Sequence, residues 1–153
     1  MVLNWTLKPF AELTPLELYA ILRLRNEVFV VEQQCVFQDA DNKDPRCHHL
    51  MGWEADELMA YTRIVPPFVS YTEPAIGRVV TSPKARGTGL GRLLMERSVE
   101  ALYGLYGEVP IRIGAQVHLE KFYRSIGFTP DGHEYDEDGI AHIEMVRPCL
   151  RFS

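Results

Sequence analysis

Residues 76–94 read IGRVVTSPKARGTGLGRLL, and this stretch is the most informative part of the sequence. It begins as a β-rich run, passes through a loop that contains Gly87, Gly89 and Gly91, and continues as an apolar segment with helical spacing. Glycine lets a ligand approach the backbone closely, and the free N–H groups at a helix start attract anions. The stretch therefore predicts a strand, a loop and a helix arranged to bind a pyrophosphate group.

Two better-known phosphate motifs do not match this loop. The glycines have a GxGxG spacing, whereas the dinucleotide fingerprint requires GxGxxG, and no lysine in the chain is followed by Ser or Thr as a Walker loop requires. Lys84, Arg86 and Arg92 add positive charge around the glycines. On these residues alone, a flexible turn with a solvated basic face stays open as an alternative.

The composition predicts one globular domain over residues 1–153. Apolar residues make up 46% and charged residues 24%, which favours a buried core and argues against disorder. The formal net charge of −5 opposes general binding to nucleic acid, so any polyanion site must be local. No apolar run approaches the roughly 18 residues that cross a bilayer, and residues 1–10 do not look like a secretion signal. We therefore expect a cytoplasmic protein with no membrane partner.

The three cysteines favour free thiols and no metal site. Cys35, Cys47 and Cys149 form no CxxC pair, so a disulfide framework is not expected and a reducing compartment is consistent. His48 and His49 follow Cys47, but adjacent side chains of an extended segment point to opposite faces and rarely bind one ion. We therefore predict that no metal takes part.

Helices and strands alternate along the rest of the chain. A helix start is predicted at Thr14 because Thr14 suits the N-cap, Pro15 the first turn and Glu17 a capping box. The predicted helices are residues 14–31, 89–103 and 118–126, and the predicted strands are residues 2–7, 50–53, 58–65, 75–81, 109–115, 133–135 and 141–146. This order predicts an α/β or α+β sheet covered by helices.

A second motif downstream decides between the readings of the glycine loop. The pattern RxxGxG at residues 86–91, followed by FYxxxGF at residues 122–128, resembles the acyl-CoA-binding core of the GNAT superfamily of acetyltransferases. More narrowly, five further segments are similar to the ElaA-like subfamily: residues 28–33, 38–41, 76–79, 114–116 and 137–143. The resemblance covers nearly the whole chain, but it does not supply the physiological acceptor.

This resemblance implies an α/β (α+β) fold with a GNAT-like mixed, mostly antiparallel sheet and helices on both faces. The sheet would splay between its fourth and fifth strands, near residues 79–81 and 111–115, and acyl-CoA would enter the gap. The implied cofactor-binding residues are Val79, Val80, Thr81, Arg86, Gly87, Thr88, Gly89, Leu90, Gly91, Arg92, Gln116 and Tyr123. Val79 and Val80 could equally be buried strand residues, and both roles can hold together.

The resemblance also implies that Tyr123 carries proton transfer. When an amine attacks a thioester, a CoA thiolate leaves, and a phenol with an ordinary pKa of about 10 can give it a proton at hydrogen-bond distance. The alternative is structural: an amphipathic Tyr123 would close the core beside Phe122 and Phe128.

The residues leave the general base open. Glu32, His49, Glu134, His142 and Glu144 are all candidates, and we prefer Glu32, acting through a water molecule, because it lies beside the expected acceptor cleft. A solvated carboxylate at a helix end is the alternative for Glu32. His142 has a suitable side chain, but a single histidine in a strand is more often structural or exposed.

Acidic residues surround the expected acceptor site. Glu32, Asp39, Asp41 and Asp44 lie at or after the end of the first long helix, and residues 134–138 add further acids, so together they predict a cationic amine acceptor. Ordinary solvated acids are the alternative. The residues expected to bind the acceptor are Arg25, Phe29, Glu32, Asp41, His49 and His142.

The predicted function is that of an acetyl-CoA-dependent N-acetyltransferase, which moves an acetyl group directly to a primary amine of a small molecule or peptide. All three cysteines lie outside the matched acyl-CoA elements, so an acyl-enzyme on cysteine has little support. A non-catalytic, acyl-CoA-responsive binding or regulatory module is the alternative. Exposed sheet edges leave a homodimer open, without fixing a stoichiometry.

Overall fold

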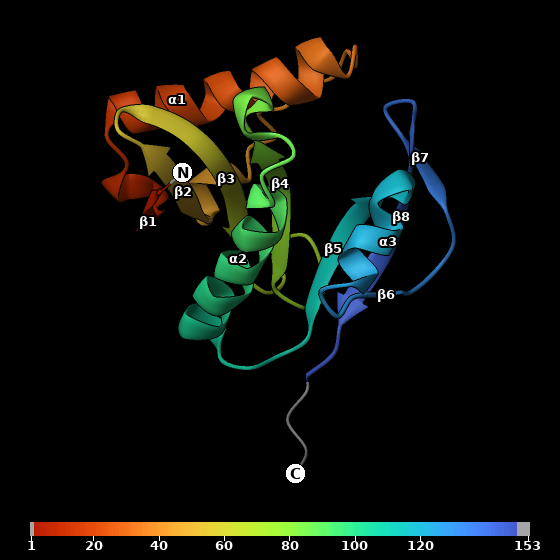
Figure 1. Ribbon diagram of the computed structural model, residues 1–153. Helices are drawn as coiled ribbons and strands as arrows, with labels where there is room; N and C mark the ends of the chain where they lie inside the picture. The colour runs from red at the N-terminus through yellow and green to blue at the C-terminus, as the bar shows by residue number, and fades with distance from the viewer. Residues whose placement is uncertain (1, 150–153) are drawn as a thin grey trace.

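The computed structural model describes residues 2–149, which form a sheet with helices on both faces (Figure 1). The helices are α1 (Pro15–Arg25), α2 (Leu90–Tyr106) and α3 (Glu120–Arg124). The strands are β1 (Asn4–Pro9), β2 (His48–Glu54), β3 (Glu57–Val65), β4 (Ala75–Thr81), β5 (Ile111–Gln116), β6 (Thr129–Pro130), β7 (Tyr135–Glu137) and β8 (Ile140–Arg147).

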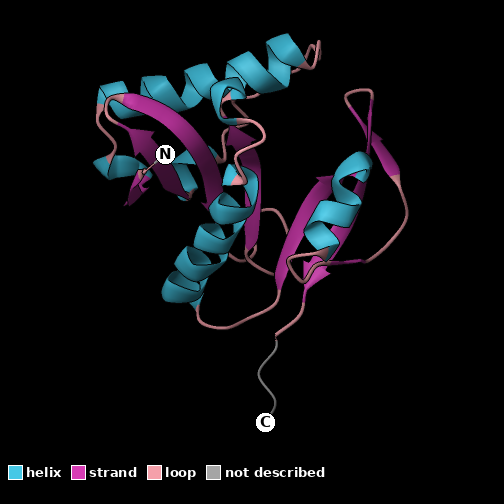
Figure 2. Cartoon of the chain, viewed as in Figure 1, coloured by secondary structure: helices cyan, strands magenta, loops and turns pink. Residues whose placement is uncertain are grey.

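The sheet divides into two parts where β4 meets β5 (Figure 2). The strand order is β1-β2-β3-β4-β5-β8-β6, and β7 pairs with β8. Among the described strands every neighbouring pair is antiparallel except β4 and β5, which run parallel and pair only at Ala75 and Arg112. The two strands therefore diverge along the rest of their length. The splayed, mostly antiparallel sheet expected from the resemblance is confirmed.

Alternation along β2 places helices on opposite faces of the sheet. Leu50 packs in a cluster with Leu90 and Leu94 of α2. The next residue, Met51, packs in a different cluster with Ile21 of α1. Successive side chains of a strand point to opposite faces, so α1 and α2 cover the two sides of this part of the sheet.

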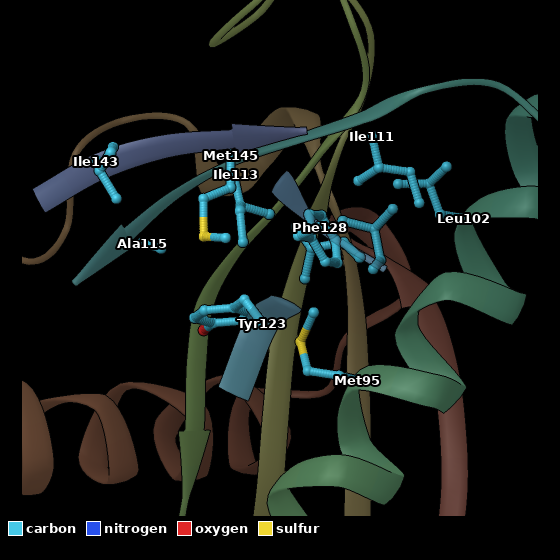
Figure 3. Close-up of a cluster of buried hydrophobic side chains, with 11 residues drawn as sticks. Met95, Leu102, Ile111, Ile113, Ala115, Tyr123, Phe128, Ile143 and Met145 are labelled. Carbon is cyan, nitrogen blue, oxygen red and sulfur yellow. The ribbon is translucent and has the colours of Figure 1, made fainter. Parts of the chain in front are cut away.

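The largest core cluster joins the two parts of the sheet (Figure 3). It contains Met95 of α2, Ile111 of β5 and Met145 of β8, and all three side chains are fully buried. The ring of Tyr123 packs edge-on against Phe128 in the same cluster. Tyr123 thus has the structural role that the sequence leaves open, and this role does not exclude a chemical one.

The start of α1 matches the capping box predicted from the sequence. The Thr14 side chain accepts a hydrogen bond from the Glu17 backbone at 3.1 Å, and the Thr14 backbone donates to the Glu17 carboxylate at 2.9 Å. Pro15 occupies the first helical position, where its missing N–H costs nothing. Local side-chain chemistry therefore sets the start of this helix.

The periodicity predicts that the first helix continues to Val31, but the regular α-helix is shorter. It ends at Arg25, and residues Asn26–Glu32 form a wider, π-helical turn. The Gln33 N–H donates to the Val28 carbonyl at 3.1 Å, a bond that spans five residues instead of four. The β-branched and aromatic side chains between Val28 and Val31 lose freedom in a tight helix, which favours the wider turn.

Other boundaries differ from the prediction by a few residues. β1 begins and ends two residues later than expected, and the helix expected at 118–126 is a short turn, Val117–Leu119, followed by α3. The sequence does not predict β6, because a strand of two residues has no alternation to detect.

A buried network of ion pairs holds the loop between α1 and β2. Arg25 is fully buried, and its guanidinium contacts Asp39 and Asp44 at 2.8 Å each. Arg63 of β3 contacts Asp41 at 2.7 Å and Asp44 at 3.0 Å. The expectation that Arg25 binds the acceptor is corrected, because its charge is used inside the protein.

Burial and charge act in opposite directions on Asp44. Burial alone would raise the pKa of its carboxyl group, but hydrogen bonds and charge from Arg25 and Arg63 outweigh this effect and lower the pKa. Asp44 is therefore ionised at neutral pH. The loop depends on keeping this buried carboxylate paired.

We expect Arg25→Met to destabilise the fold, because the change leaves buried carboxylates without their partner. Removing one partner of a buried ion pair costs about 3–5 kcal/mol, so the free energy of unfolding measured with urea should fall by that amount. Arg23→Met is the matched control, since the Arg23 side chain is 68% exposed and its ion pair with Glu27 is expected to contribute less than about 1 kcal/mol. Equal stability of the two variants would contradict the structural role of Arg25.

Candidate active site

A cavity of about 540 Å³ lies where β4 and β5 separate. Its walls come from β3, β4, β5, α3, the loop after α1 and the hairpin of β7 and β8. Small-molecule sites commonly have volumes of this order. The residues predicted for the site that line this cavity are Phe29, Asp41, Val79, Gln116, Tyr123 and His142.

A bulge in β4 shapes the strand edge beside the cavity. The pairing with β3 shifts register, and β4 has one extra residue between Gly77 and Val80. Arg78, inside this bulge, has a φ of +50°, a conformation that is uncommon for residues other than glycine. Val79 lines the cavity, whereas Val80 is buried on the α1 side and Thr81 lies outside the lining.

The glycine loop has the open backbone that the sequence predicts. Gly87 and Gly89 have φ values of +78° and +81°, and no atom lies within 4 Å of the position that a Cβ would take on either residue. Gly89 is the N-cap of α2, so the first N–H groups of the helix have no acceptor within the helix. The Thr88 hydroxyl donates to the Ala85 carbonyl at 2.5 Å and closes the loop. An anion can therefore approach the backbone here.

Both arginines of this loop already have partners in the protein. Arg86 donates to the two carboxylate oxygens of Glu32, at 2.8 and 2.5 Å. Arg92 donates to the Ser125 hydroxyl at 3.0 Å and pairs with Glu96 at 3.2 Å. The two arginines are exposed enough to attract an anion. To contact one, Arg86 must either share its guanidinium group between the anion and Glu32 or break its ion pair with Glu32.

The structure argues against Glu32 as the general base. Glu32 is not among the residues that line the cavity, and its side chain is 40% exposed. The hydrogen bond from Arg86 lowers the pKa of Glu32 and outweighs the opposite effect of burial. A carboxylate with a lowered pKa is a weaker base. The expected roles of Glu32 as base and as acceptor-binding residue are therefore corrected.

Tyr123 lies in the cavity wall, at the edge of the core cluster. Its side chain is buried, and its hydroxyl makes no hydrogen bond within the described part of the chain. Burial raises the pKa of Tyr123 to about 12. The phenol therefore keeps its proton at neutral pH and has a donor free for a ligand.

His142 is the candidate base whose side chain lines the cavity. Its Nδ1 lies 2.8 Å from the Ile140 carbonyl, and a carbonyl only accepts, so Nδ1 carries the proton of a neutral ring. Nε2 can then accept a proton, and it lies 3.5 Å from the Glu137 carboxylate. Tyr135 stacks on the ring with centroids 5.7 Å apart and holds its orientation.

His49 lies outside the cavity lining and is fully buried. Its ring nitrogens contact the Tyr61 hydroxyl at 2.7 Å and the Asp44 carbonyl at 3.0 Å, and burial lowers its pKa. The expected acceptor role of His49 is therefore corrected to a structural one. Glu144, another candidate base, pairs with Arg112 at 3.0 Å and does not line the cavity.

Arginines neutralise the acids of the loop after α1, which are one part of the acidic surface expected to attract a cationic acceptor. Asp41 contacts Arg63 at 2.7 Å and Arg78 at 3.4 Å, and Asp39 contacts Arg78 at 2.8 Å. Burial would raise the pKa of Asp41, but the two arginines and a backbone hydrogen bond lower it instead. With Arg25 and Asp44, the network contains three carboxylates and three guanidinium groups. It presents no excess negative charge to an acceptor.

Two tyrosines of the cavity were missed by the sequence reading. The hydroxyls of Tyr71 and Tyr135 converge on Gly114 of β5, where a Cβ would lie 3.2 and 2.8 Å from them. A larger residue at this position would force the two tyrosine side chains to shift. A glycine inside a predicted strand is a known sign of such close approach, and it is the signal that could have located this wall.

The described residues contain no helix long and apolar enough to cross a membrane. Within the same residues, no three His, Cys, Asp or Glu side chains form a group that could hold a metal ion. Cys35, Cys47 and Cys149 are free thiols, as the sequence predicts, and the Cys35 thiol contacts the Asp138 carbonyl at 3.1 Å.

Comparisons with known proteins agree with this geometry. Residues 21–148 match the family description "Acetyltransferase (GNAT) domain". The protein ElaA of Escherichia coli K12 is 41% identical over 152 residues, which cover 98% of this chain and 99% of ElaA. The solved structure of E. coli ElaA has a TM-score of 0.89 and covers 95% of this chain and 99% of that one.

Other solved structures extend the likeness. An acyl-CoA N-acyltransferase from Pseudomonas aeruginosa has a TM-score of 0.89 and 46% identity, covering 94% of this chain and 99% of its own. An aminoglycoside 6'-N-acetyltransferase solved with coenzyme A has a TM-score of 0.72, covers 97% of this chain and 99% of its own, and at 14% identity shares the fold alone. The family match and the near full-length identity to ElaA together show that the chain is an acyltransferase of the GNAT family and belongs to its ElaA-like group.

Proposed function

We propose that this protein transfers an acetyl group from acetyl-CoA directly to a primary amine of a small molecule or peptide. Family membership establishes acyl-CoA-dependent acyl transfer in general, and the amine and the direct route are our inference. The observation that carries the proposal is the Tyr123 hydroxyl, which is protonated, has no hydrogen-bond partner among the described residues and lies in a cavity at the strand gap.

Acetyl-CoA would bind along the glycine loop and β4. The backbone N–H groups of residues 88–91 suit the pyrophosphate, and Arg86 and Arg92 add attraction at longer range. Beyond Ala75, β4 has no partner on the β5 side, so its backbone groups can bind the amides of the pantetheine arm. On this arrangement Val79, Val80 and Thr81 contribute mainly backbone, and Gln116 binds from the opposite strand.

The transfer proceeds in one displacement. The amine nitrogen attacks the carbonyl carbon of the thioester, the C–S bond breaks, and CoA leaves as a thiolate. Tyr123 donates its proton to the sulfur, and Nε2 of His142 accepts a proton from the amine. The Glu137 carboxylate lies 3.5 Å from the same nitrogen. Both residues return to their starting states by proton exchange with solvent. No acyl-enzyme forms, because the amine attacks the thioester directly.

Release of CoA from acetyl-CoA across a panel of primary amines tests this proposal. Amine-dependent release with formation of the N-acetyl product supports it. Tight binding of acetyl-CoA without release would favour the acyl-CoA-responsive module instead. A cytoplasmic location and the absence of nucleic-acid binding stay predictions from composition and charge.

We expect Gly89→Val to weaken acetyl-CoA binding, because a branched side chain would fill the open space above the loop. Because backbone hydrogen bonds to the charged pyrophosphate are lost, the Kd for acetyl-CoA, measured by calorimetry, should rise by about tenfold to a hundredfold. Gly107→Val is the matched control: Gly107 ends the same helix, has a φ of +85° and is equally open. An unchanged Kd in a folded Gly89→Val protein would remove the loop from pyrophosphate binding.

We expect Tyr123→Phe to slow acetyl transfer by about 10²–10⁴-fold, the usual contribution of a general acid. The phenyl ring keeps the contact with Phe128, so acetyl-CoA affinity should change little. The single-turnover rate measures the effect, and Tyr19→Phe, at an exposed position, is the control. A rate close to that of the wild type would rule out the acid role.

The pH dependence provides a second readout for Tyr123. Its raised pKa of about 12 means that the acid form persists at higher pH than for an ordinary tyrosine. The single-turnover rate should therefore show no loss from Tyr123 ionisation between pH 7 and about pH 10. An alkaline loss in this range that disappears in Tyr123→Phe would contradict the raised pKa.

We expect His142→Gln to lower kcat by about 10²–10⁴-fold, because it removes the proton acceptor for the amine. Acetyl-CoA affinity should stay the same, since the glycine loop is untouched. His133→Gln, at an exposed position before β7, controls for loss of a histidine elsewhere. If His142→Gln retains wild-type kcat at every pH tested, another group removes the proton.

A further inference from the structure

One wall of the cavity, formed by the loop after α1 and the arginines paired with it, carries one more positive charge than its acids neutralise. The three aspartates and three arginines of the buried network balance one another. Lys43 also lines the cavity and forms no ion pair within residues 2–149, while its Nζ donates to the Ser70 hydroxyl at 3.0 Å. An ammonium group has three N–H donors, so two remain for a ligand.

Arg63 adds an unused donor on the same wall. Its terminal nitrogens contact Asp41 and Asp44, but its Nε has no hydrogen-bond partner among the described residues, although the side chain is only 4% exposed. Buried donors are seldom left without an acceptor, so each one calls for an explanation.

Gly77 leaves space beside this donor. Gly77 pairs with Arg63 across β3 and β4, and both line the cavity. A Cβ at Gly77 would lie 3.9 Å from the Arg63 Nε, at ordinary contact distance. The Nε itself is buried, and the missing side chain at Gly77 leaves unfilled space beside it. An anionic oxygen is the partner that a guanidinium group prefers.

The hairpin wall of the cavity has the opposite charge. Glu137 and Asp138 line it beside His142, and neither acid pairs with a lysine or arginine within the described residues. One cavity thus presents spare positive charge from the loop and spare negative charge from the hairpin. Such a separation complements a ligand that carries both charges.

We propose that the acceptor is a small zwitterion, an amine that also carries a carboxylate, as a free amino acid does. Its carboxylate contacts Lys43 and the Arg63 Nε beside Gly77, and its amine lies toward Glu137 and His142. This inference rests on the proposed function and names the substrate class of the same site. It replaces the purely cationic acceptor that the acidic loop and hairpin together predict from sequence, because arginines neutralise the loop acids.

Acceptors that differ only at the carboxylate test the inference. Each standard amino acid is compared with its α-amide and with the amine that remains after decarboxylation, and CoA release is measured for all of them. For the amino acids that serve as acceptors, we expect kcat/KM to exceed that of their amides by about tenfold to a hundredfold. Equal or higher kcat/KM for the amides and decarboxylated amines would overturn the proposal.

Two substitutions locate the carboxylate subsite. Gly77→Ala adds a methyl group beside the Arg63 Nε at a distance that the fold tolerates, and Lys43→Met removes the ammonium group at similar length. Each should reduce the preference for acid over amide toward unity, mainly through KM. Gly104→Ala and Lys121→Met are the matched controls, because both lie outside the cavity lining. An unchanged preference in both test variants would overturn the subsite.

A binding measurement separates this inference from the proposed function. The melting temperature of the CoA-bound protein is measured with amino acids and with their amides, which needs no chemistry. Stabilisation specific to the acids and lost in Gly77→Ala, without any acetyl transfer, would support the subsite and refute the proposed function. Acetyl transfer without any preference for the acids would support the proposed function and overturn the subsite. Stabilisation without such a preference would also overturn the subsite.

Discussion

The divergence of β4 from β5 organises the site and the sheet around it. The two strands pair at Ala75 and Arg112 and then separate, so backbone groups along both edges lack a sheet partner. The sheet can open because α2 packs on both parts, through Leu94 on one side and Met95 on the other. Unpaired backbone along such a gap can form hydrogen bonds with the amides of an extended ligand. The cavity, the glycine loop and Tyr123 are arranged around it.

Charge pairing decides what the acceptor side of this gap can bind. Buried carboxylates are tolerated here because guanidinium groups hold them, and the same pairing removes their attraction for a cation. The charges that remain are few, and Lys43 and Glu137 lie on different walls. Gly77 and Gly114 leave space beside polar side-chain atoms, namely the Arg63 Nε and the hydroxyls of Tyr71 and Tyr135. The chemistry of this cavity thus depends on what the network leaves unpaired.

The two groups assigned to proton transfer differ in how the fold prepares them. Burial alone raises the pKa of Tyr123, which keeps the phenol a proton donor. His142 is prepared by hydrogen bonding, because Nδ1–H donates to the Ile140 carbonyl and leaves Nε2 as the proton acceptor. An acid and a base can therefore act in the same cavity at one pH.

Features that depend on near neighbours could be predicted from the amino-acid sequence. The Thr14 capping box, the left-handed glycines of the loop and the motif around Tyr123 are each set by residues a few positions apart. Which charges face a ligand becomes apparent only in the folded chain. Glu32 looked like a base until folding placed Arg86, 54 positions away, on its carboxylate. Local geometry follows from short-range sterics and hydrogen bonds, whereas burial and ion pairing follow from long-range contacts that no local pattern encodes.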